Sequence, residues 1–118
     1  MNIYDHIHAL ADALKNSNEF NNYKEAKEKL EADPKAKEMF LDFRKFQFEF
    51  QKDQMEGKQV EEGKTEKLKS MYEVLNLNIT VREYLAAEYQ FGKIMADISK
   101  ILGEAVGLEE LEQMTGSS

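Results

Sequence analysis

Residues 33–57 read DPKAKEMFLDFRKFQFEFQKDQMEG, and this stretch decides the fold. Asp33 can accept a hydrogen bond from a free backbone N–H at the start of a helix. Pro34 suits the first helical position, where its missing N–H would have had no partner. Gly57 is a typical residue just beyond a helix end. The stretch therefore predicts one helix from Pro34 to about Glu56, about 35 Å long.

The apolar residues of this helix form two stripes. The main stripe falls within about 60° of the circumference at about 100° per residue, and it comprises Met39, Phe43, Phe46 and Phe50. The second stripe lies on the opposite side at a spacing of seven, and it comprises Leu41, Phe48 and Met55. Burying one such side chain is worth roughly 1.5–3 kcal/mol, so a row of three normally meets a partner. The partner is another subunit, which we favour, or another helix of the same chain.

Period-3.6 patterning predicts four further helices. They span about Asn2 to Lys15, Asn18 to Ala32, Thr65 to Asn78 and Thr80 to Gly103, with a flexible connection at 57–64 and a short amphipathic turn at 108–114. One proline and six glycines interrupt the chain, and this scarcity favours long helices over a turn-rich β fold. We expect an all-α antiparallel bundle of four to five helices, two of them long. It forms a single domain over residues 1–114, followed by a disordered tail at 115–118.

The predicted helix from Thr80 to Gly103 has an apolar sector that covers about half of its circumference, which is wider than a surface helix needs. The side chains that we expect at an interface on this helix are Phe91, Ile94, Ile98 and Ile101. Together with the second stripe of the preceding long helix, they give more apolar surface than one small bundle can use. We therefore expect a homo-oligomer, with a dimer as the leading state because two-fold dimers are the commonest closed assembly.

Composition excludes several functional classes. The 118 residues include 23 acidic and 16 basic side chains, a net charge of −7 at pH 7, which argues against direct binding of nucleic acid by phosphate neutralisation. The chain has no cysteine, so it can form no disulfide and no cysteine-ligated cluster, and we expect no cofactor. No segment resembles a signal peptide or a membrane span of about eighteen apolar residues. We therefore expect a cytoplasmic protein.

One group of side chains has the residue types of a metal site. Asp5, His8 and Asp12 share a helical stripe at spacings of three and four, and imidazole and carboxylate are ordinary metal ligands. A metal-dependent enzyme or metal sensor that uses these three residues is therefore the alternative function. The simpler interpretation is a polar face on an exposed helix.

No motif in the sequence identifies a reaction. Neither a phosphate-binding G-x-x-x-x-G-K-[ST] loop nor a G-x-S-x-G nucleophile turn occurs. Glu88 lies at the edge of an apolar stripe, where a buried carboxylate could be catalytic, but we expect it to pair with a Lys or Arg of a neighbouring helix or of a partner subunit. We therefore expect no enzymatic activity.

A series of short motifs resembles the YlbF/YmcA/YheA family of small bacterial proteins, and is closest to its YheA-like branch. The similarity covers residues 2–107, and its specificity comes from the order and spacing of the motifs. They are Asn2-Ile3-Tyr4-Asp5, Asp33-Pro34-Lys35-Ala36-Lys37, Gln54-Met55-Glu56-Gly57-Lys58, Val81-Arg82-Glu83-Tyr84-Leu85 and Met95-Ala96-Asp97-Ile98.

The resemblance implies an all-α fold of long antiparallel helices that forms dimers or higher oligomers, and a non-enzymatic role. Better-studied members act as accessory proteins for competence, sporulation and biofilm formation, in a complex linked to an RNA-processing endonuclease. Those members are associated with iron–sulfur clusters through cysteines, which this chain lacks. The cluster is therefore not carried over, and membership of that complex stays open. We predict a regulatory or adaptor protein that acts through helix-mediated protein–protein association, with itself and with other regulatory proteins.

Overall fold

The computed structural model describes residues 2–58 and 62–108, and within these ranges the secondary structure is entirely helical. The helices are α1 (Ile3–Lys15), α2 (Asn18–Glu31), α3 (Pro34–Met55), α4 (Glu62–Leu77) and α5 (Ile79–Val106). The predicted all-α fold is confirmed. Helix α4 begins earlier than expected, at Glu62, which shortens the predicted connection at 57–64. The predicted turn at 108–114, beyond its first residue, and the predicted tail at 115–118 lie outside the described residues.

Local capping explains where the helices begin. At four helix starts a side-chain oxygen accepts a hydrogen bond of 2.7 to 3.1 Å from a backbone N–H two or three residues later, and the capping residues are Asn2, Ser17, Asp33 and Asn78. Each such cap contributes typically about 1 kcal/mol to stability. Helix α5 ends at Val106 and is followed by Gly107, whose φ of 71° lies in the left-handed region that glycine adopts without strain.

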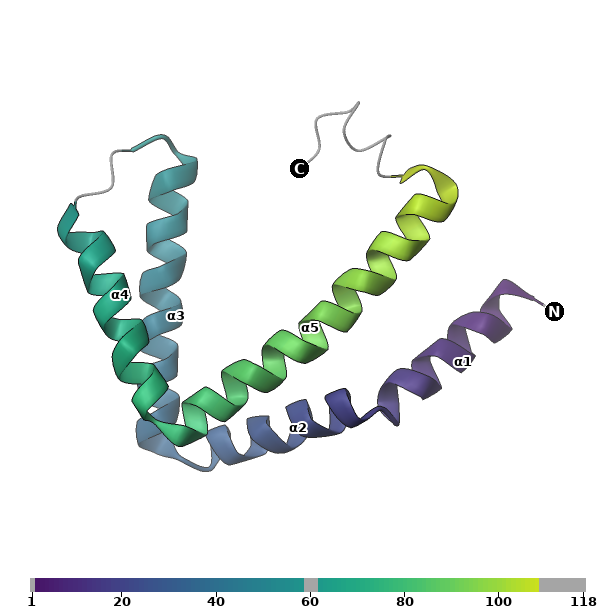
Figure 1. Ribbon diagram of the computed structural model, residues 1–118, viewed down its shortest axis with the longest axis horizontal. Coiled ribbons are helices and arrows are strands. Elements are labelled where there is room, and N and C mark those ends of the chain that lie inside the picture. The colour runs from purple at the N-terminus through teal and green to yellow at the C-terminus, as the bar shows by residue number, and fades with distance from the viewer. Residues whose placement is uncertain (1, 59–61, 109–118) are drawn as a thin grey trace.

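The helices form a V rather than a compact bundle (Figure 1). Helices α3 and α4 make one arm, and α5 packs along α2 in the other, with α1 continuing the line of α2 away from the vertex. The molecule measures 54 × 39 × 15 Å, and its radius of gyration is 18.4 Å, against about 13.5 Å for a compact chain of this length. The paired helices of each arm, α3 with α4 and α2 with α5, are antiparallel as expected. The two arms diverge because the core joins them only near the vertex.

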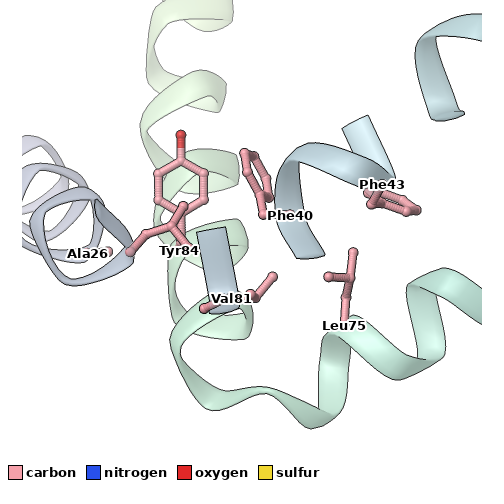
Figure 2. Packing of buried hydrophobic residues seen from close by; sticks show 8 residues of the cluster. Ala26, Phe40, Phe43, Leu75, Val81 and Tyr84 are labelled. Atoms are coloured by element: carbon pink, nitrogen blue, oxygen red, sulfur yellow. The ribbon is translucent and has the colours of Figure 1, made fainter. Parts of the chain in front are cut away.

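The hydrophobic core lies at this vertex. It draws on α2 to α5 and comprises Ala26, Leu30, Ala36, Phe40, Phe43, Leu75, Val81 and Tyr84. Figure 2 shows the ring of Phe40 beside that of Tyr84, in an edge-on arrangement with ring centroids 5.1 Å apart, which is a favourable geometry for an aromatic pair. Two of the core residues, Ala36 and Val81, are completely buried. The core therefore fixes how the two arms meet and leaves the outer parts of both arms as single layers.

Replacing a core leucine should cost far more stability than replacing an exposed one on the same helix. Leu75 is 2% exposed and Leu77 is 84% exposed. We expect Leu75→Ala to lower the free energy of unfolding by about 2–5 kcal/mol, because it removes buried methyl groups and leaves a cavity. Leu77→Ala should change it by no more than about 0.5 kcal/mol. Urea denaturation of both variants tests this, and equal effects would mean that the vertex is not the core.

Candidate protein-interaction surface

The second stripe of α3 is not covered by any helix of the chain. Leu41, Phe48 and Met55 are 52%, 68% and 88% exposed. Helix α4 packs on the other side of α3, where the Phe43 ring lies 6.0 Å from that of Tyr72. Packing within the chain, the second interpretation of this stripe, therefore does not occur in the structure. An interface with another chain remains the prediction for these three side chains.

The predicted interface on α5 divides into two parts. Phe91 packs within the chain, because its ring centroid lies 5.5 Å from that of Phe20 and 5.4 Å from that of Tyr23, both on α2. Ile94 and Ile98 are half-buried and Ile101 is exposed. The apolar face of α5 therefore begins as intrachain packing near Phe91 and continues towards the C-terminal end of the helix without full cover.

A third apolar surface lies on α1 and was not among the predicted interface residues. Ile3, Ile7 and Leu10 share one face of α1 and are 74%, 50% and 40% exposed. No residue of α1 is buried, and among the described helices α1 contacts only α2. The spacing of these residues in the sequence indicates an amphipathic helix, but it gives no sign that the apolar face would be left uncovered.

The structure does not support the metal site proposed as the alternative. Asp5, His8 and Asp12 all lie on the exposed surface of α1, and the described residues contain no group of three His, Cys, Asp or Glu side chains that could hold a metal ion. The reason is geometric, since Asp5 and Asp12 are separated by two helical turns, about 10 Å along the axis. Side chains that far apart on one straight helix do not converge on one ion. The structure therefore gives no support to a metal site at these residues.

Glu88 pairs with a neighbouring helix, as predicted. Its carboxylate accepts a hydrogen bond from the guanidinium of Arg44 on α3, and the same guanidinium lies 4.9 Å from the centre of the Phe40 ring. The pair joins the two arms close to the vertex. Both side chains are more than a third exposed, so the interaction resembles a surface ion pair, which is typically worth no more than about 1 kcal/mol. The Glu88 carboxylate therefore serves to link α5 to α3.

The fold and its surfaces define a class of protein: a small, all-helical chain with a core at one vertex and apolar helix faces left in water. Within the described ranges, no helix has both the length and the apolar content needed to cross a membrane. Residues 3–107 match the family described as "Control of competence regulator ComK, YlbF/YmcA". The chain belongs to this family, which confirms the resemblance found in its sequence.

Similar proteins cover nearly the full chain. A UPF0342 protein of Caldicellulosiruptor saccharolyticus is 45% identical, over 92% of this chain and 91% of its own length. UPF0342 protein STH1710 of Symbiobacterium thermophilum is 40% identical, over 91% and 96%. These names state no activity.

Two solved structures share the fold. The first is a protein of unknown function, DUF964, from Bacillus stearothermophilus, with a TM-score of 0.76, 24% identity and coverage of 93% of this chain and 95% of that chain. The second is Bacillus subtilis RicA in complex with RicF, with a TM-score of 0.61, 23% identity and coverage of 91% and 95%. At these identities the similarity establishes the fold alone.

Tyr84 should make stability depend on pH in the alkaline range. Burial raises the pKa of its hydroxyl above the ordinary value of 10.0, and the neighbouring Tyr23 and Glu88 act in the same direction. The folded protein therefore holds this proton more tightly than the unfolded chain does. The contribution of Tyr84 to stability is fully present below about pH 10 and is lost as the pH rises above it.

We expect Tyr84→Phe to reduce this alkaline loss of unfolding free energy, as measured by urea denaturation on either side of about pH 10. The matched control is Tyr89→Phe on the same helix, where the ring is 71% exposed. It should keep the pH dependence of the unchanged protein. An equal alkaline loss in all three proteins would show that Tyr84 does not carry the effect.

Proposed function

We propose that this protein is a non-enzymatic regulatory or adaptor protein that acts by helix-mediated association with other proteins, including a second copy of itself. The observation that carries the proposal is the exposed α3 stripe of Leu41, Phe48 and Met55. Its seven-residue spacing matches one position of a heptad, the repeat by which one helix packs along another. A rigid helix that presents such a row to solvent is suited to receive a helix of a partner.

The comparisons support an association role. The family's description refers to control of a competence regulator, which is a regulatory rather than a catalytic task. RicA, which shares this fold, has been crystallised in complex with RicF, so a chain of this architecture can form a complex with another protein. The α3 stripe offers a surface for such a contact, because it lies outside the core and on the opposite side of α3 from α4.

Replacing Phe48 with glutamate tests the proposal. Tagged protein is recovered from its native bacterial host, and bound proteins are quantified by mass spectrometry for the unchanged chain, for Phe48→Glu and for Gln54→Glu. The control introduces the same charge on the same helix at an exposed position outside the stripe. A glutamate at Phe48 removes apolar contact worth about 1.5–3 kcal/mol, so we expect at least one bound protein to be depleted about tenfold or more.

The control should keep the full set of bound proteins. Two results would overturn the proposal. One is the absence of any protein enriched over a tag-only sample with the unchanged chain. The other is equal recovery of every partner by Phe48→Glu and by the unchanged chain, provided that circular dichroism shows the variant to be folded.

A further inference from the structure

The chain exposes much more surface than a compact protein of its size. Its solvent-accessible surface is 9443 Å², whereas a folded monomer of 13.7 kDa exposes about 6,600 Å². If the residues outside the described ranges were counted as exposed as in an unfolded chain, the described residues would still expose about 7,100 Å², which is about 1,000 Å² more than the ~6,000 Å² of a compact chain of their mass. A stable interface of standard size buries about 800 Å² on each partner. The uncovered area is therefore enough for a stable dimer.

Helix α1 cannot account for its own stability. It has 13 residues, none of them buried, and isolated helices shorter than about 12–15 residues are marginal in water. Stable short helices obtain their stability from packing of an apolar face. Within the described chain that packing is confined to the end of α1 next to α2, while Ile3 and Ile7 remain exposed. The apolar face of α1 therefore needs cover from another molecule.

The C-terminal half of α5 presents a second uncovered face in the same arm. Beyond Phe91, the large apolar side chains of this helix that are exposed are Met95, Ile101, Leu102 and Val106. Figure 1 shows α1 and this part of α5 extending away from the vertex on the same side of the molecule. No Cα atom of α1 lies within 8 Å of one in α5, so the two helices do not pack on each other. One arm thus carries two apolar helix faces without partners.

We infer that these two faces form the homodimer interface, in which α1 and the C-terminal half of α5 pack against the same two segments of a second copy. A two-fold interface brings one patch against itself, and two apolar helix faces from each copy supply the four helices of a bundle core. Electrostatics permit the contact, although each chain carries a net charge of −7. Asp5 and Asp12 lie on the opposite side of α1 from Ile7, at about 100° per residue, and so remain in solvent.

This inference rests on the proposed function and deepens it, because it identifies the second copy as the occupant of one particular arm. The α3 stripe belongs to the other arm, so this inference assigns it to a different protein and no longer to the second subunit that the sequence favoured. The dimer and the partner complex therefore use separate surfaces, and each can be disrupted without the other.

Two substitutions in one turn of α1 test the interface. Ile7→Glu places a charge on the apolar face, and the control His8→Glu places the same charge on the polar face. The mass in solution is measured by light scattering over a dilution series. We expect the unchanged chain and His8→Glu to be dimers at micromolar concentration. We expect Ile7→Glu to dissociate with a Kd raised about 100-fold or more, because a two-fold interface loses this buried apolar side chain from both copies.

Hydrogen exchange on the unchanged chain provides a second measurement that needs no variant. Backbone amides of residues 3–15 and 94–106 should lose protection together when the protein is diluted below its Kd, whereas protection in residues 34–55 should not change. Ile101→Glu should weaken the dimer as Ile7→Glu does, since the two side chains belong to the same proposed core.

Three results would overturn the inference: a monomer at the highest concentration reached, a dimer equally stable in Ile7→Glu and His8→Glu, or dilution-dependent protection located in residues 34–55. Each is distinguishable from failure of the proposed function. A monomer that still loses bound proteins on Phe48→Glu would refute the dimer and leave the adaptor role standing. A dimer with the expected exchange pattern that recovers no other protein would do the reverse.

Discussion

The packing of the first turns of α5 against α2 and α3 holds the two arms in one molecule. Val81 and Ala36 are completely buried there, and the ring of Tyr84 lies 5.1 Å from that of Phe40 and 5.8 Å from that of Tyr23. Where aliphatic and aromatic side chains pack this closely, a substitution that changes side-chain volume disturbs the packing. The relative direction of the arms is therefore set by a few side chains. Beside them, the Arg44–Glu88 ion pair joins α3 to α5.

A core confined to the vertex has a consequence for the rest of the molecule. Each arm is one layer of helices, and a helix in a single layer can bury only the side that faces its neighbour. The apolar residues on the remaining sides stay in water unless a second molecule covers them. The α3 stripe and the α1–α5 faces lie on different arms (Figure 1), so the two proposed contacts would not compete for one surface. This separation is compatible with the proposed adaptor role.

The lack of cysteine bears on how such an assembly is held together. The family resemblance implies iron–sulfur clusters in members that carry cysteines, and this chain has no residue of that type. This chain therefore contributes no cysteine ligand to a complex, and its own contacts are made by other side chains. The apolar character of the uncovered faces agrees with that physical basis, because burial of apolar area is the dominant favourable term in most protein association.

The sequence by itself determined the helices, since capping and helical periodicity are local properties. Asp33-Pro34 marked the start of α3, and the position of Glu88 within an apolar helix indicated its pairing with a basic side chain of a neighbouring helix. The two stripes of α3 could also be recognised, but not which of them would be covered. Periodicity shows that a helix face is apolar. Whether another helix packs on that face depends on the direction that the next helix takes after the turns at Asn16-Ser17 and at Gly57. Only the tertiary structure decided that the bundle opens into a V and that the apolar face of α1, although evident in the sequence, has no partner within the chain.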